Sequence, residues 1–197
     1  MYRFFKRLLD LIFAYILLIL CYLPMSIIAI LIKIDDGGPV IFKQVRMGMN
    51  GKRFICYKFR TMRPDAPSEL STAEFTNAGE YITHIGLFLR KTSLDELPQL
   101  FNILIGEMSF VGPRPLIKNE HEIHKARKQY GVYNVRPGLT GLAQVCGRDK
   151  LTALRKAECD AVYVSNMSFV IDLNIITLTI IKVIKSEGNT EYEEGIT

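Results

Sequence analysis

Two adjacent acidic residues, Asp95 and Glu96, stand in the stretch KTSLDELPQL (91–100) and are the first candidates for chemistry. An ionised carboxylate can attack a phosphorus centre and form an acyl phosphate, and neighbouring carboxylates can hold Mg²⁺ together with substrate phosphates. A structural interpretation competes with this one. Ser93 and Glu96 have the Ser-x-x-Glu spacing of a capping box, in which each side chain satisfies a backbone N–H of the other. This stretch alone leaves both interpretations open.

Pro98 helps to separate the two interpretations. If Asp95 is the N-cap of a helix, Pro98 is the third helical residue, where its missing N–H costs nothing. If Ser93 is the cap, Pro98 falls one turn into the helix and a hydrogen bond is lost. The proline therefore favours Asp95 at the start of the helix, where the helix dipole would keep the carboxylate ionised and attract a phosphate.

Basic residues that stand beside glycine, proline or expected strand ends form the second part of a possible site. A guanidinium group on a rigid turn commonly recognises phosphate, because its fork binds two oxygens at once. Cations of this kind, two carboxylates and a divalent metal ion are the groups that phosphoryl transfer needs. The alternative is a set of surface ion pairs that contribute little. The residues concerned are Lys58, Arg60, Arg90, Arg114, Arg136 and Arg148.

Composition limits the class of protein. The chain has 197 residues, a net charge of +5 and 49% hydrophobic residues, enough for one domain with a substantial core. Basic residues gather on both sides of an apolar run, which favours an anionic membrane surface or an anionic substrate. Nucleic acid is not expected as a partner, because the sequence contains no nucleic-acid motif. The four cysteines form no CxxC pair and are expected to be reduced thiols.

The apolar run from Leu11 to Ile32 contains no charged residue. Its length of about 22 residues corresponds to a helix of roughly 33 Å, against a hydrocarbon core of about 30 Å, which indicates a membrane helix. Pro24 must kink or break that helix, and the basic residues on both flanks favour the same side of the membrane for both ends. A re-entrant segment that breaks at Pro24 satisfies both observations. From the residues alone, spanning and re-entrant forms both remain open.

The fold class expected is α/β, mostly α. It combines an N-terminal membrane helix–break–helix (1–34), a cytoplasmic catalytic domain (35–185) and a polar tail (186–197). A β-hairpin is predicted around Asn50-Gly51, and its second strand delivers Lys58 and Arg60. A compact helical part with short strands follows. Its predicted elements are a loop at 63–80, helices at 82–90, 93–104, 119–130 and 151–165, a loop with a short strand at 135–149, and an apolar helix at 169–185 on the core or at the membrane interface.

Several long blocks, in order and over almost the whole chain, resemble the bacterial sugar transferases, also called monotopic phosphoglycosyl transferases. The short length is similar to that of the minimal members of this family. The blocks are FKRLLDLIFA, GGPVIFKQVRMGMNGKRFICYKFRTM, LRKTSLDELPQLFNILIGEMSFVGPRP, VRPGLTGLAQVCGRD and ECDAVYVSNMSFVIDL.

The resemblance implies an enzyme on the cytoplasmic face of the bacterial inner membrane. It would transfer a sugar 1-phosphate from a UDP-sugar to undecaprenyl phosphate and release UMP, as the first membrane step of glycoconjugate synthesis, with downstream glycosyltransferases as possible partners. Blocks such as GLTGLAQVCGRD look most like members that act on N-acetylated amino sugars. The apolar segment matches the family's re-entrant helix, broken at Pro24, with both ends cytoplasmic.

The resemblance also implies roles for individual residues. Asp95 would carry a covalent intermediate, Glu96 would be its partner acid, and both would hold Mg²⁺. Lys58, Arg90 and Arg114 match the family's cationic positions near the phosphates. Arg60 is also expected to bind phosphate, and the expected nucleotide or sugar region contains Gln144 and Arg148.

The sequence departs from the family pattern at two positions. Leu23 precedes the proline where the family often has Ser, which leaves open the group that caps the helix break. Leu142 stands where the family often has Trp before the GxxQVxGR loop. Two rival functions also remain to be separated: a Mg²⁺-dependent phosphatase, in which water replaces the lipid, and a membrane-anchored adaptor, which would tolerate Asp95→Asn.

Overall fold

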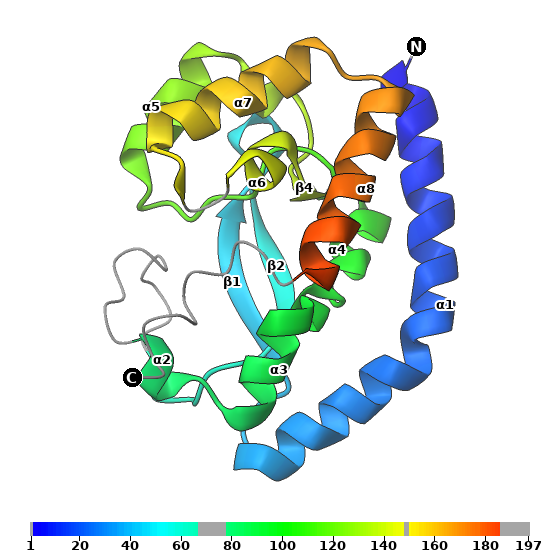
Figure 1. The fold of residues 1–197 in the computed structure, drawn as a ribbon, viewed down its shortest axis with the longest axis vertical. Helices are drawn as coiled ribbons and strands as arrows, with labels where there is room; N and C mark the ends of the chain where they lie inside the picture. The colour runs from blue at the N-terminus through cyan, green and yellow to red at the C-terminus, as the bar shows by residue number, and fades with distance from the viewer. Residues whose placement is uncertain (1, 67–77, 148–149, 186–197) are drawn as a thin grey trace.

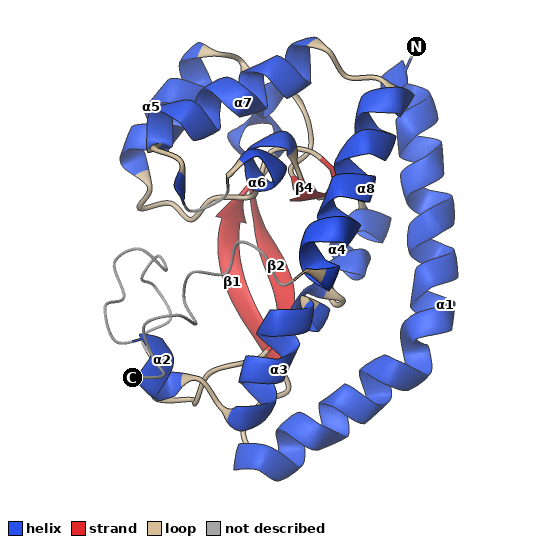
Figure 2. Ribbon diagram, in the orientation of Figure 1, coloured by secondary structure: helices blue, strands red, loops and turns tan. Residues whose placement is uncertain are grey.

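A long helix runs along one side of the molecule, and a β-hairpin with the remaining helices forms a domain beside it (Figure 1). The computed structural model describes residues 2–66, 78–147 and 150–185. Helices predominate and the strands are few and short (Figure 2), which confirms the predicted mostly helical α/β class.

Helix α1 (Tyr2–Asp36) contains Pro24 and bends in its second half (Figure 1). A proline has no N–H to donate to the carbonyl four residues before it, here that of Leu20, so a bend at this point has a clear physical cause. The Ser26 hydroxyl donates to the carbonyl oxygen of Tyr22 at 2.8 Å and stabilises the same turn. The helix continues through the proline, so the structure has the kink of the two predicted outcomes, a kink or a break.

Both halves of α1 pack against the same domain. Before the bend, Ala14 is fully buried against Leu100 and Ile103. After the bend, Ile28 and Ile32 are buried in a second cluster with Phe59 and Leu89. Most of the side chains between these contacts, around Ile19 to Leu23, are exposed. The helix is therefore held to the domain at its two ends and leaves its most apolar middle uncovered.

The first part of α1 is also held by polar contacts to the last helix, α8 (Phe169–Ile184). Asp172 of α8 is buried and accepts hydrogen bonds from Lys6 Nζ at 2.6 Å and from the Tyr2 hydroxyl at 2.7 Å. The hydroxyl of Tyr163 donates to its other oxygen at 2.8 Å. These contacts explain why an acidic residue stands within an otherwise apolar helix: its charge is paired and hydrogen-bonded.

The predicted hairpin around Asn50-Gly51 is present. Strands β1 (Ile41–Met47) and β2 (Arg53–Phe59) pair in antiparallel fashion around the short 3-10 turn η1 (Met49–Gly51). Asn50 has a φ of 57°, which an asparagine tolerates better than most residues. The register places Lys58 opposite Phe42.

The remaining elements agree broadly with the predicted boundaries. The short helix α2 begins in the predicted 63–80 loop and ends one residue after it, and residues 67–77 of that loop lie outside the described part of the chain. Strands β3 and β4 form a parallel pair, and Ile175 of α8 packs in a cluster with Val111 and Tyr163. The elements are α2 (Ala78–Tyr81), α3 (His84–Thr92), η2 (Leu94–Glu96), α4 (Gln99–Ile105), β3 (Ser109–Val111), α5 (His121–Gln129), η3 (Val132–Asn134), β4 (Gly138–Thr140), α6 (Leu142–Cys146) and α7 (Ala153–Ser165).

Docking of α1 on the domain can be tested at Ala14. We expect Ala14→Leu to lower the stability of the whole domain by about 1–3 kcal/mol, because a larger side chain cannot fit a fully packed position. Ile16→Leu is the matched control, since Ile16 is 44% exposed on the same helix. The melting temperature in detergent, followed by circular dichroism, measures both. Equal melting temperatures for the two variants would mean that α1 is not part of the core.

Candidate active site

Two carboxylates and two cations from three separate segments meet beside the hairpin. The ammonium nitrogen of Lys58, on β2, lies 2.6 Å from Glu96 Oε1 and 3.7 Å from Asp95 Oδ2. A guanidinium nitrogen of Arg114, from the turn after β3, lies 3.9 Å from the same Glu96 oxygen. The fold therefore brings Lys58 next to Glu96, which lies 38 positions later in the sequence.

Neither predicted form of helix capping is present at the acidic pair. Ser93 has a φ of 57°, ends α3, and makes no side-chain capping bond, so the capping box is not formed. A capping residue needs an extended backbone, which a left-handed residue does not have. Asp95 lies inside the 3-10 turn η2, and α4 begins only at Gln99, directly after Pro98. The prediction that Asp95 is the N-cap of this helix was therefore wrong.

Burial has the largest effect on the pKa of Asp95, where the sequence predicted an effect of the helix dipole. The residue is 9% exposed, and loss of solvent raises the pKa of its carboxyl group above the ordinary value. The positive charge of Lys58 opposes this shift, and the neighbouring Glu96 adds to it. The charges of Arg90 and Arg114 also favour the ionised form. The carboxylate is thus poorly solvated and surrounded by cations, which is the environment of a reactive group.

Arg90 lies on the side of the site formed by α3. Its Nε donates to the hydroxyl of Thr61 at 2.9 Å, and its charge acts on Asp95. Thr61 comes directly after the end of the hairpin and had not been recognised as a partner from the sequence. The prediction that Arg90 belongs with Lys58 and Arg114 is consistent with this position.

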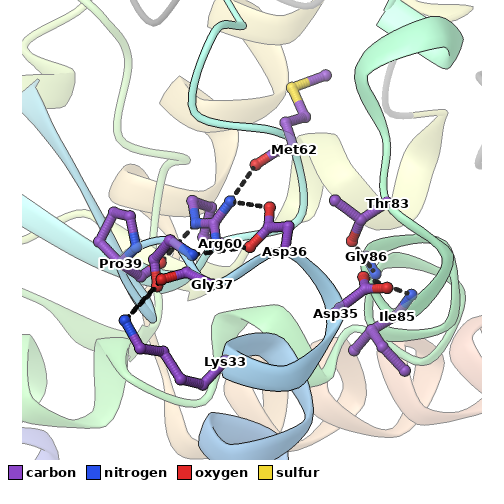
Figure 3. A network of polar contacts seen from close by, with 11 residues as sticks. Lys33, Asp35, Asp36, Gly37, Pro39, Arg60, Met62, Thr83, Ile85 and Gly86 are labelled. Carbon is purple, nitrogen blue, oxygen red and sulfur yellow. Dashed lines mark hydrogen bonds and ion pairs between the residues drawn. The ribbon is translucent and has the colours of Figure 1, made fainter.

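Arg60 occupies a different environment, although it is only two residues from Lys58. Its guanidinium group pairs with the carboxylate of Asp36 and bonds to the carbonyl oxygens of Pro39 and Met62 (Figure 3). The side chain is 6% exposed. These contacts connect the end of α1 to the end of β2. Direct phosphate binding by Arg60 stays a prediction, and its described contacts give it a structural role.

The same network fixes the end of α1 to neighbouring segments (Figure 3). Lys33 Nζ donates to the carbonyl oxygen of Gly37 at 2.6 Å, and the backbone N–H of Ile85 donates to Asp35 at 3.4 Å. Thr83 caps α3 by accepting from the N–H of Gly86 at 3.0 Å. The end of α1 is therefore bound to the start of α3, the helix that carries Arg90.

Gln144 and Arg148 cannot be placed together. The amide nitrogen of Gln144, on α6, donates to the carbonyl oxygen of Leu139 at 3.3 Å. Its side-chain oxygen is buried and has no hydrogen-bond partner among the described residues. Arg148 lies outside the described residues. A nucleotide or sugar role for these two residues stays a prediction.

Arg46 is a cation near the site that the sequence analysis did not single out. It lies on β1 two residues after Gln44, and alternation along the strand puts it on the face of Phe42, the partner of Lys58. Burial lowers the pKa of Arg46 to about 10, and the nearby charge of Arg114 acts in the same direction. Alternation along the strand was the signal that could have found Arg46, because positions 42, 44 and 46 share one face and position 42 lies opposite Lys58.

The donor set is compatible with Mg²⁺. Asp95 and Glu96 both approach the ammonium group of Lys58, so their carboxylates point into a common space. Mg²⁺ is usually held by one or two carboxylates, waters and substrate phosphates. The described residues contain no cluster of three or more potential metal ligands, so a bound Mg²⁺ would depend on phosphate oxygens from the substrate.

The structure thus combines a long apolar helix, docked on a domain, with two carboxylates that lie among cations. Helix α1 is long and apolar enough to cross a membrane, and 11% of its most apolar window is buried. The chain belongs to the bacterial sugar transferase family, whose sequence profile matches residues 1–186.

Individual relatives are similar over most of this chain. It is 42% identical over 183 residues to an uncharacterized sugar transferase, EpsL, of Bacillus subtilis. That alignment covers 93% of this chain and 89% of the relative. It is 39% identical over 198 residues to the exopolysaccharide production protein ExoY of Rhizobium meliloti, with 93% and 87% covered. It is 42% identical over 185 residues to a UDP-glucose:undecaprenyl-phosphate glucose-1-phosphate transferase of Klebsiella pneumoniae, covering 90% of this chain and 40% of that protein.

The raised pKa of Asp95 predicts the effect of removing its charge. The pKa of the Asp95 carboxyl group is higher in the folded than in the unfolded state. The free energy of unfolding therefore falls as the pH rises from the unfolded-state pKa through the folded-state pKa. Asp95→Asn should therefore keep or raise the melting temperature at neutral pH, and the difference from wild type should shrink in acid. A helix-capping role predicts instead a loss of about 0.5–2 kcal/mol. The exposed Asp65, changed to Asn, is the control.

Proposed function

We propose that the protein transfers a sugar 1-phosphate from a UDP-sugar to undecaprenyl phosphate and releases UMP. The observation that carries this proposal is the buried Asp95 carboxylate beside Glu96, with Lys58 and Arg114 directed at the pair. The activity for which the Klebsiella relative is named supports the same reaction type. The reaction is the first membrane step of a glycoconjugate pathway.

In the first half-reaction, a carboxylate oxygen of Asp95 attacks the β-phosphorus of the UDP-sugar. The new bond joins that oxygen to phosphorus, and the bond from phosphorus to the oxygen of UMP breaks, so UMP leaves with the electron pair. Lys58 and Arg114 neutralise negative charge that develops on the phosphate oxygens. Glu96 holds the ammonium group of Lys58 at 2.6 Å and so directs that cation towards the reacting centre.

In the second half-reaction, an oxygen of the lipid phosphate attacks the same phosphorus. The bond to Asp95 breaks, the carboxylate is restored, and the sugar is left on a lipid diphosphate. Burial of Asp95 limits the access of water, which would otherwise hydrolyse the acyl phosphate. This is the step that distinguishes the transferase from a phosphatase.

Asp95 and Glu96 would also hold Mg²⁺ when it is bound with substrate. The ion would supply positive charge next to the phosphate oxygens. The two carboxylates are suited to this, because they already approach a common cation, the ammonium group of Lys58.

For the sugar, we propose an N-acetylated amino sugar, on the basis of the short sequence blocks quoted above. Relatives whose names specify a sugar include the glucose-1-phosphate transferase of Klebsiella and a UDP-galactose-lipid carrier transferase of Erwinia amylovora, which is 40% identical over 200 residues and of which 42% is covered. A substrate panel must therefore include UDP-glucose and UDP-galactose.

For the membrane arrangement, we propose that α1 is re-entrant and that the domain lies on the cytoplasmic face of the inner membrane. Both ends of α1 pack against the same domain, at Ala14 and at Ile28 and Ile32. A straight crossing would separate the two ends by the thickness of the bilayer. The exposed side chains near the bend, such as Leu20 and Leu23, would enter the hydrocarbon.

The covalent step can be tested by intact-protein mass. With a UDP-sugar and Mg²⁺ but no lipid acceptor, wild type should gain the mass of one sugar phosphate, located on the peptide that contains Asp95, and should release UMP. Asp95→Asn should gain no mass, because an amide is not a nucleophile at this centre. Asp65→Asn, an exposed control, should behave as wild type.

Addition of undecaprenyl phosphate then distinguishes the transferase from the rival phosphatase. A transferase makes a lipid-linked sugar diphosphate, whereas a phosphatase makes free sugar phosphate. Near-wild-type turnover of Asp95→Asn would rule out the covalent mechanism. If no UDP-sugar in the panel yields UMP, the proposed function is wrong.

The membrane arrangement predicts that both ends of the chain face the cytoplasm. Single cysteines placed at positions 2 and 185 of a cysteine-free variant should both be protected from an impermeant thiol reagent in intact cells, and both should react after lysis. Reaction of one position alone in intact cells would establish a spanning helix and contradict the re-entrant proposal.

A further inference from the structure

The segment that carries Arg114 is held along its whole backbone. Every carbonyl oxygen from Pro113 to Ile117 accepts a hydrogen bond, and the donors come from β1, α5 and the start of β4. In chain order the donors are the N–H of Gly138 at 2.9 Å, Arg127 Nη1 at 2.7 Å, Arg46 Nη1 at 3.0 Å, the N–H of Met47 at 2.9 Å and His124 Nε2 at 2.7 Å.

Arg127 makes the contact at Arg114 itself. It lies on α5, is 2% exposed, and donates through Nη1 to the carbonyl oxygen of Arg114. Its other donors bind Asp160 of α7, with Nε at 2.8 Å and Nη2 at 2.6 Å from one carboxylate oxygen. Asp160 is 1% exposed. The guanidinium plane is therefore fixed by α7, and its remaining nitrogen is directed at the backbone of a site residue.

A buried ion pair is a poor way to gain stability, because desolvation offsets most of the attraction. An apolar pair of similar size would fill the same space between α5 and α7. Only a guanidinium group can bind a carboxylate through two nitrogens and still present a third to a carbonyl oxygen. The side chain of Arg114 is 34% exposed and reaches Glu96 from this backbone, so the place where the backbone is held sets the point from which the guanidinium group approaches the acid.

We propose that Arg127, oriented by Asp160, is a positioning residue for Arg114 in the sugar-phosphate transfer. This inference rests on the proposed function for its kinetic part, while the contact itself does not. Arg127 has no described contact with the carboxylates of Asp95 and Glu96, so its proposed effect on the site passes through the backbone of Arg114. A lysine at position 127 keeps the charge but cannot bind Asp160 and the Arg114 carbonyl oxygen in the same geometry.

The first test is hydrogen exchange of the full-length protein in detergent, followed by mass spectrometry. Arg127→Lys should speed exchange in peptides that cover 113–120 and leave peptides of the hairpin unchanged. Ile175→Val is the matched control, because Ile175 is as buried as Arg127, at 2% exposed, and packs in a cluster that contains no residue of 113–120. Equal exchange in 113–120 for the two variants would overturn the proposed contact. Asp160→Asn, which keeps the shape of the side chain, provides a second variant should Arg127→Lys not fold.

The second test is a double-mutant cycle on UMP release. Arg127→Lys should lower kcat/KM by about tenfold or more, since a displacement of roughly 1 Å at a positioned group can cost a hundredfold. In an Arg114→Ala background, the same change should cost less than about twofold, because the group that it positions is absent. A general loss of stability would lower activity by the same factor in both backgrounds, and that result would overturn the positioning role.

The two tests separate this inference from the proposed function. If wild type releases UMP and the cycle is additive, the function stands and the positioning role fails. If wild type releases no UMP from any UDP-sugar, the function fails, and the kinetic role of Arg127 fails with it. The exchange result then decides alone whether Arg127 holds the 113–117 segment.

Discussion

The ammonium group of Lys58 allows two neighbouring carboxylates to exist in a mostly buried position. Without that cation, Asp95 and Glu96 would repel each other, and burial would favour protonation of Asp95 even more strongly. The surroundings of Asp95 therefore balance opposing effects: loss of solvent makes the anion unstable, and cations restore it. A phosphate that enters the site brings further negative charge and meets cations that are already positioned, so little reorganisation is needed.

Three successive residues of the hairpin connect this site to α1. Lys58 contacts the carboxylates, Phe59 packs against Ile28 and Ile32, and Arg60 pairs with Asp36 at the end of the helix. The end of the hairpin thus joins the acidic pair and Lys58 to the end of α1. This connection gives a structural reason for a buried arginine two residues after Lys58: Arg60 fixes the distance between the helix and the candidate site.

Much of the fold could be predicted from local sequence signals. Local residue patterns indicated α3, α5, α7 and α8, and Asn50-Gly51 indicated the hairpin, because such signals depend on near neighbours. The acidic pair and the cations were also recognisable by residue type. The prediction that Asp95 caps a helix was wrong because Ser93 adopts a left-handed conformation and ends α3. Nothing in the local sequence requires that conformation. Arg60 was grouped with Lys58 because both stand at an expected strand end, whereas its environment depends on Asp36, 24 residues away.

The sequence by itself determined the mostly helical class, the apolar helix with its proline, and the residue types that can attack and bind phosphate. These follow from composition, periodicity and covalent chemistry, which belong to each segment independently. Only the tertiary structure decided that Asp95 is buried, that Lys58 lies between the two acids, and that Arg127 reaches the backbone of Arg114. Such contacts join residues distant in the chain, and solvent exclusion is a property of the packed whole. The pKa of Asp95 and the direction of Arg114 could therefore be obtained only after folding had brought those segments together.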